Sequence, residues 1–183
     1  MAFKIEATYN VPEAGLLRIL GAGADSLLEV AEAGTGGKMF EAFELFDDEE
    51  RPIGWAVDVD TEGHNNRITL RMSYTAKSCS WLFSCCDDLV CVDQLEAPSG
   101  ICLRGMFFGC ANLERVSPTL PTERVADFSN AFAGCRSLKH VAQFSMAAAV
   151  YYYRMWEGAN VPEWARHLEA LSAQNKLFRK SGL

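Results

Sequence analysis

Cysteine and histidine are the residues of this chain that come closest to a catalytic pattern. Two pairs could combine a thiol nucleophile with an imidazole base, namely Cys135 with His140 and Cys91 with His64. Such a pair has to be partly exposed, within hydrogen-bonding distance and in electropositive surroundings that stabilise the thiolate. Cys135 lies in a repeated apolar motif that predicts burial, and the chain is acidic overall. We therefore expect no enzyme, and a thiol (Cys–His) enzyme stays as an alternative.

Metal-binding patterns are incomplete. The segment 58–63 begins like a calcium loop, because Asp58 and Asp60 alternate and Gly63 stands at the sixth position. Thr69 occupies the place where the loop needs a bidentate carboxylate. Four cysteines gather within residues 79–91, but without the paired spacing of zinc knuckles. We expect neither a metal ion nor a cofactor.

A cluster of aromatic and guanidinium groups near the C-terminus predicts a binding surface. It consists of Tyr151, Tyr152, Tyr153, Arg154 and Trp156. Three successive tyrosines cannot all face one core, and exposed Tyr, Trp and Arg side chains dominate the hot spots of protein interfaces. The alternative is that some of these residues only cover the end of a repeat array.

A sequence repeat must position these groups. Phe, Cys and Leu return in the same order within residues 83–89, 107–113 and 132–138, and Cys86, Cys110 and Cys135 are 24 and 25 residues apart. This period is typical of leucine-rich solenoids, in which each unit buries its apolar side by stacking on a neighbour. We predict repeats over residues 74–161, with these three cysteines as a ladder of buried, reduced thiols.

A fourth, degenerate repeat unit follows the third. Trp156 lies 24 residues after Phe132, and Gly158 lies 24 residues after Gly134, but no cysteine accompanies them. Terminal repeats are expected to be atypical because one side of them faces water.

Residues 1–73 differ in pattern from the repeats. Apolar and polar residues alternate with period two at 3–9, 55–60 and 67–72, which predicts strands of a small, mostly antiparallel β-rich domain. Segment 38–46 mixes strand and helix preferences, and we favour a strand.

At the other end Pro162 and the spacing of Trp164, Leu168, Leu171 and Phe178 predict a helix to about Arg179. Residues 162–183 would then cap the repeats. The predicted fold class is α+β: a β-rich N-terminal domain, a short leucine-rich-repeat solenoid and a C-terminal capping helix.

Residues 75–161 resemble the BspA-like leucine-rich repeats, whose units read approximately Met-Phe-x-Gly-Cys-x-x-Leu-x-x-Val. Met106–Val116 matches this unit throughout, and 120–132 is similar to the family's linking stretch. Glu62-Gly63-His64 is similar, though reordered, to a turn in the β-rich leader of such proteins from gut bacteria and their phages. The resemblance implies a protein-binding solenoid, often an adhesin, without catalytic residues.

Composition narrows the class of partner. The chain has 183 residues, 49% of them apolar, and a formal net charge of −7 with a pI near 5.0. Nucleic-acid binding needs clustered Lys and Arg, so direct binding is not expected. No signal peptide or membrane-spanning run is visible, and seven cysteines cannot all pair. We therefore expect a cytoplasmic protein of a bacterial or phage-infected host cell.

These observations favour a non-enzymatic protein–protein interaction module whose partner is another protein of unknown identity. A small acidic phage-type inhibitor of a host defence nuclease or another enzyme is the alternative, because an acidic surface can imitate nucleic acid. The acidic run Asp47–Glu50 fits either a solvated turn or a docking patch for a basic partner.

Overall fold

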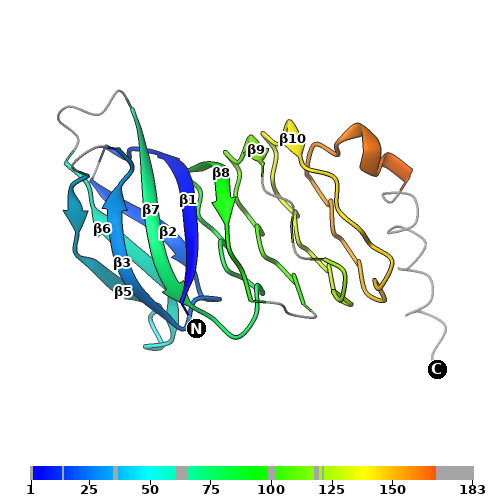
Figure 1. Ribbon diagram of the computed structural model, residues 1–183, viewed down its shortest axis with the longest axis horizontal. Coiled ribbons are helices and arrows are strands. Elements are labelled where there is room, and N and C mark those ends of the chain that lie inside the picture. The colour runs from blue at the N-terminus through cyan, green and yellow to red at the C-terminus, as the bar shows by residue number, and fades with distance from the viewer. Residues whose placement is uncertain are drawn as a thin grey trace.

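The structure is a computed structural model that describes residues 2–13, 15–34, 37–60, 66–98, 102–117, 120 and 122–167. Its strands are β1 Phe3–Asn10, β2 Leu16–Gly21, β3 Ser26–Glu32, β4 Met39–Phe40, β5 Ala42–Phe46, β6 Pro52–Asp58, β7 Arg67–Thr75, β8 Leu89–Leu95, β9 Arg115–Val116 and β10 His140–Val141. Figure 1 shows β1–β7 gathered at one end of an elongated molecule, with a row of stacked turns leading away from them.

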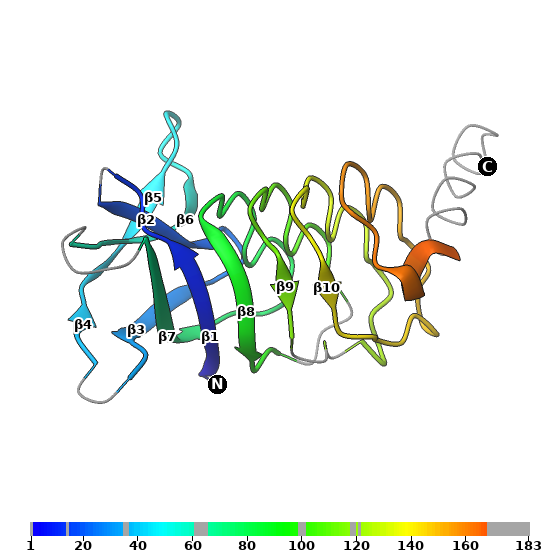
Figure 2. The same ribbon diagram turned by 90° about the horizontal axis from the view of Figure 1, so that it is seen from above.

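The strands form two sheets. One has seven strands in the order β10-β9-β8-β1-β7-β3-β4, and the other has three in the order β2-β6-β5. Pairing is antiparallel from β8 through β1 and β7 to β4, whereas β8, β9 and β10 are parallel to one another. Seen from above in Figure 2, β1, β8, β9 and β10 follow one another along the molecule.

The predicted α+β fold class is wrong. The regular secondary structure of the described residues is nearly all β-strand, and the helical element assigned among them is the 3-10 helix η1, Glu163–Ala165. Nor do the repeats form a separate solenoid, because β8 pairs with β1 and the repeats thereby extend the seven-stranded sheet. The hydrogen-bonding edge of β1 explains the difference, since β8 satisfies backbone groups that would otherwise be unpaired.

The alternating pattern of the N-terminal strands has the predicted physical cause. On β1, every second residue is buried, namely Ile5, Ala7 and Tyr9. The same alternation on β7 buries Ile68, Leu70, Met72 and Tyr74. The remaining side chains of these strands point to the opposite face. The strands predicted at 3–9 and 67–72 are present, and segment 38–46 contains the strands β4 and β5.

Successive repeats are joined turn to turn by backbone hydrogen bonds. The N–H of Phe83 donates to Met106 O at 2.8 Å, Phe107 N–H donates to Ala131 O at 2.8 Å, and Phe132 N–H donates to Met155 O at 2.9 Å. The degenerate fourth unit therefore adopts the same turn as the other three. Each hydrogen bond fixes one turn against the next at about 4.8 Å, the usual spacing of strands.

Every turn has a residue with left-handed backbone conformation at the same two positions. They are Trp81 and Cys85, Gly105 and Gly109, Asn130 and Gly134, and Arg154 and Gly158, with φ between 55° and 83°. Glycine occupies four of these eight positions because it adopts positive φ at little cost. The shared backbone geometry allows one turn to stack on the next in register.

Two side-chain ladders fill the interior of the turns. Phe83, Phe107, Phe132 and Trp156 stack with ring centroids 5.2, 5.4 and 4.5 Å apart. Beside them lie the ladder thiols, Cys86, Cys110 and Cys135, which are buried and unpaired as predicted.

The ladder thiols also make hydrogen bonds from turn to turn. Cys110 Sγ donates to Phe83 O at 2.9 Å, and Cys135 Sγ donates to Phe107 O at 3.1 Å. Burial raises the pKa of the Cys86 and Cys135 thiols to about 12 and that of Cys110 well above its usual value.

The N-terminal strands close the first turn of the stack. Gly21 N–H donates to Leu82 O at 2.8 Å, and a Cβ atom on Gly21 would lie 2.4 Å from Trp81 O. A Cβ atom on Gly23 would lie 2.1 Å from Ser80 O. These two glycines allow the β2–β3 turn to approach the backbone of the first repeat more closely than any side chain would permit.

The far end is covered by Trp164 of η1 rather than by the predicted capping helix, most of which (168–183) lies outside the described residues. Its indole Nε1–H donates to Val141 O at 2.9 Å, at the outer edge of β10. Its ring meets Phe144 edge-on at 5.1 Å and Trp156 at 6.4 Å. Trp164 thus blocks further strand pairing at this carbonyl and covers the end of the aromatic ladder.

Candidate binding surfaces

The five residues predicted to bind a partner lie on the last turn of the stack, but they do not form one surface. Tyr151 is 51% exposed, and Tyr152 and Tyr153 are half-buried. Trp156 is only 3% exposed because it ends the aromatic ladder. The exposed members of the predicted set are therefore Tyr151 and Arg154.

Arg154 is held in place by its neighbours. Its guanidinium lies 5.9 Å from the ring centroid of Tyr153 and forms an ion pair with Glu157. Tyr151 extends this patch along the same turn, beside Val150, which is 58% exposed. The result is a small surface of aromatic and charged groups at the C-terminal end of the stack, and its role in binding stays a prediction.

A larger surface is the solvent-facing side of the seven-stranded sheet, here called the outer sheet face. It is made by the outward-pointing residues of β1, β3 and β7–β10 and of the segments that enter β9 and β10. Its polar members are Lys4, Glu6, Thr8, Glu29, Arg67, Thr69, Arg71, Ser73, Cys91, Asp93, Gln94, Glu114, Arg115, Lys139 and His140.

Strand register aligns these side chains in rows across the sheet. Thr69, Thr8, Cys91, Arg115 and His140 are successive register partners on β7, β1, β8, β9 and β10. The two threonine hydroxyls lie 2.8 Å apart. One straight row thus runs from the N-terminal strands to the third repeat, so the face is continuous across both parts of the sequence.

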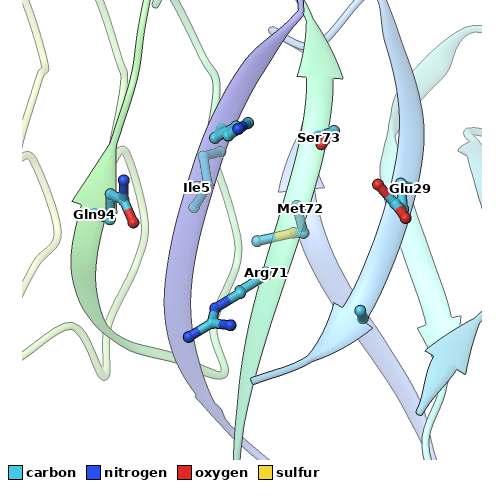
Figure 3. A pocket seen from close by; sticks show the side chains of 8 residues that line it. Ile5, Glu29, Arg71, Met72, Ser73 and Gln94 are labelled. Carbon is cyan, nitrogen blue, oxygen red and sulfur yellow. The ribbon is translucent and has the colours of Figure 1, made fainter. Parts of the chain in front are cut away.

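A cavity of about 290 Å³ lies on the same face, over β3, β7, β1 and β8. Figure 3 shows Glu29, Ser73, Arg71 and Gln94 on neighbouring strands, with the Arg71 side chain reaching towards β1. There the Arg71 Nε–H donates to Glu6 Oε2 at 2.6 Å. The cavity floor is apolar, because Ile5 and Met72 line it from the core side.

A second cavity, of about 220 Å³, lies over the repeats. It is lined by Arg67, Glu114, Arg115, Lys139 and His140, together with Val90 and Cys91. Lys139 Nζ lies 3.1 Å from Glu114 Oε2, and Arg67 Nη2 lies 3.6 Å from Glu114 Oε1. We call this cavity the cationic pocket, because three formal cations and one carboxylate line it.

The outer sheet face differs in charge from the rest of the chain. Its charged members comprise the cations Lys4, Arg67, Arg71, Arg115 and Lys139 and the carboxylates Glu6, Glu29, Asp93 and Glu114. The face therefore carries a net formal charge of +1, whereas the whole chain carries −7. The face is thus close to neutral, and the acidic excess of the chain lies outside it.

The structure separates one of the two thiol–histidine pairs considered from the sequence, Cys135 and His140. Cys135 lies in the core and its thiol has a pKa raised to about 12 by burial, whereas His140 is exposed on the outer sheet face. His64 lies outside the described residues. Cys91 shares a row with His140, but Arg115 stands between them.

Cys91 is the one thiol on the outer sheet face, and its contacts keep it protonated. Burial, followed by hydrogen bonding to Asp93, raises its pKa despite an opposing contribution from Thr8. Its Sγ donates to Asp93 Oδ2 at 3.3 Å, and Arg115 Nη2 donates to Asp93 Oδ1 at 2.6 Å. This arrangement orients the Arg115 guanidinium and raises its pKa, chiefly through the hydrogen bond to Asp93.

No group of three or more metal-ligating side chains is found among the residues that the structure describes. The segment Thr61–Asn65 of the calcium-like loop lies outside them. Of the four cysteines within residues 79–91, Cys79 and Cys86 are buried, and Cys85 is exposed.

Part of the outer sheet face could have been predicted from the sequence. Cys91, Arg115 and His140 each precede the valine of a repeat, so strand alternation places all three on the face opposite the buried valines. The outward-facing residues of β1 and β7 could likewise have been predicted from the alternation of apolar and polar residues. What the sequence did not show is that β8 lies next to β1, which joins the two sets of rows.

No family model matches the chain, and searches of curated proteins and of solved structures likewise give no match. Within the described part of the chain, no helix is both long and apolar enough to cross a membrane.

Proposed function

We propose that the protein is a non-enzymatic protein–protein interaction module that binds its partner on the outer sheet face. The observation that carries the proposal is the continuous row from Thr69 to His140, which aligns polar side chains from five strands on one rigid surface. A surface of this kind suits a large ligand, because many preorganised contacts can form without ordering a loop.

Three further features support this proposal. The ion pairs Arg71–Glu6 and Arg115–Asp93, both 2.6 Å long, hold long side chains in fixed positions before a partner arrives. Arginine is also enriched at interface hot spots. The resemblance of the repeats to BspA-like units agrees with a binding role, and the C-terminal patch around Tyr151 offers a second contact region.

Site-specific photo-cross-linking in the native host tests the proposal and distinguishes the two surfaces. Benzoylphenylalanine is placed at Gln94 on the outer sheet face, at Tyr151 on the last turn, or at Glu49 on the β5–β6 hairpin as control. All three positions are exposed, with the Glu49 side chain 70% accessible. We expect one discrete protein adduct from Gln94 and none from Glu49.

The adduct has to depend on the chemistry of the face. Arg115→Glu should abolish it, because the change reverses one charge in the middle of the row and opposes Asp93, while the melting temperature stays close to that of the parent protein. An adduct from Tyr151 alone would assign binding to the C-terminal patch. An adduct from Glu49 alone would contradict the proposal.

A further inference from the structure

We infer that the cationic pocket binds a carboxylate side chain of an acidic segment on the partner protein. This inference rests on the proposed protein-binding function and specifies the chemistry of the contact. Its basis is the convergence of Arg67, Arg115 and Lys139 on one cavity of a chain whose net charge is −7.

The pocket has donor capacity beyond its internal ion pairs. The distance of 3.6 Å between Arg67 Nη2 and Glu114 Oε1 is longer than a good hydrogen bond, so the contacts of Arg67 with the residues that the structure describes leave most of its five N–H donors to a ligand. Lys139 contributes three N–H donors, of which one points to Glu114. Arg67 and Lys139 are 53% and 68% exposed at their side chains, so an incoming group can reach both.

Glu114 indicates which group the pocket accepts. Its carboxylate already lies between Arg67 and Lys139 and thus occupies the place that a ligand carboxylate would take. With Arg115 added, the lining cations exceed the lining carboxylates by two. Asp93 lies just outside this lining and pairs with Arg115 at 2.6 Å, which reduces the local excess of positive charge to one. A ligand carboxylate would reduce this excess, and charge-assisted hydrogen bonds to guanidinium and ammonium groups are the strong ones.

Local charge decides the contact, although the whole chain is acidic. Charges further than about 8–10 Å from the ligand are largely screened at physiological salt, whereas the groups that line the cavity are not. A long polyanion such as nucleic acid extends past the pocket onto the acidic remainder of the chain and is therefore disfavoured. A short acidic peptide segment places its charge only where the cations are.

The test measures binding of a fluorescein-labelled hexaglutamate peptide to the purified full chain by fluorescence anisotropy at low salt. Lys139→Gln and Arg67→Gln should each weaken binding about tenfold, since each removes one charged hydrogen-bond donor. Glu114→Gln should tighten binding several-fold, because the internal carboxylate no longer competes. Arg51→Gln is the matched control, since Arg51 is 65% exposed on the β5–β6 hairpin, away from the outer sheet face, and should change the affinity less than twofold.

The Glu114→Gln result is the sharpest, because a damaged fold cannot raise affinity. Weaker binding by this variant, or an equal loss with Arg51→Gln, would overturn the inference. So would displacement of the peptide by inorganic phosphate at lower concentration than by free glutamate peptide, or tighter binding of a hexathymidylate. If the peptide does not bind but cross-linking at Gln94 still yields its adduct, the inference fails while the proposed protein-binding function stands.

Discussion

Alanine substitutions at the second left-handed position of the turns test how closely the backbones of neighbouring repeats are packed. Gly109, Gly134 and Gly158 occupy this position with φ of 77°, 83° and 67°. An alanine in this conformation costs about 1–2 kcal/mol. Reduced freedom of the unfolded chain returns roughly 0.4–1 kcal/mol. The conformational change alone therefore predicts a net loss of about 1 kcal/mol at each site.

The three sites differ in the space available for the new methyl group. At Gly158 no atom lies within 4 Å of the added Cβ, and at Gly109 the nearest is Cys85 Sγ at 3.5 Å. At Gly134 the Cβ would lie 3.3 Å from Gly109 Cα and 3.4 Å from its backbone nitrogen. Backbone cannot rotate away, so the two turns have to separate, at a further cost of about 1–2 kcal/mol.

The expected losses of unfolding free energy are thus about 1 kcal/mol for Gly158→Ala, slightly more for Gly109→Ala, and about 2–3 kcal/mol for Gly134→Ala. Urea unfolding followed by tryptophan fluorescence measures all three, and an unchanged m value shows that the variants unfold from equally compact states. Equal losses at Gly134 and Gly158 would refute the reasoning, because they would mean that the turns are not in tight contact.

Three further predictions concern the core and its end. Trp164→Phe should lower the unfolding free energy by about 1 kcal/mol, because the hydrogen bond to Val141 O is lost. Trp164→Ala should lower it by roughly 2 kcal/mol more, because the end of the aromatic ladder is uncovered; equal urea midpoints for the two variants would contradict this role. Cys110→Ser should cost about 1–3 kcal/mol in the same assay, since a buried hydroxyl is more costly to take out of water than a thiol even where Phe83 O can accept its hydrogen bond, and a native-state thiol reagent should modify Cys85 before any ladder thiol. Folding raises the pKa of the Cys86 and Cys135 thiols from 9.0 to about 12 and that of the Cys110 thiol well above 9.0. The unfolded state therefore loses protons first as pH rises, so the stability that these thiols contribute below pH 9 should fall by roughly 1 kcal/mol per thiol per pH unit between about pH 9 and pH 12; a melting temperature constant from pH 8 to 10.5 would contradict this.

Local patterns predicted the repeated turns better than the arrangement of the sheet. Phe83 and its equivalents, and the ladder thiols beside them, follow from a 24–25-residue period, because identical units can only stack with identical residues in contact. The strand parity of β1 and β7 was readable for the same local reason. The pairing of β8 with β1 was not, since nothing in either strand specifies its lateral neighbour.

The predicted binding residues illustrate the same limit at the level of single side chains. Trp156 and Arg154 are two residues apart, yet one ends the aromatic ladder and the other lies in solvent. Composition alone did not distinguish the buried residue from the exposed one. The repeat register would have distinguished them, because Trp156 is the equivalent of the buried Phe132. The cationic pocket was missed because Arg67 and Lys139 come together only when β7 and β10 share a sheet.

The position of β1 between β7 and β8 has a consequence for how the chain is made. Phe3 pairs with Tyr74, and Ile5 pairs with Leu95, so β1 is synthesised well before the two strands that pair with it. Contacts of such sequence separation slow folding. During synthesis one edge of β1 stays unpaired until β7 has emerged and the other until β8 has emerged, and a nascent chain stalled between the two presents a bare strand edge to chaperones or to other chains.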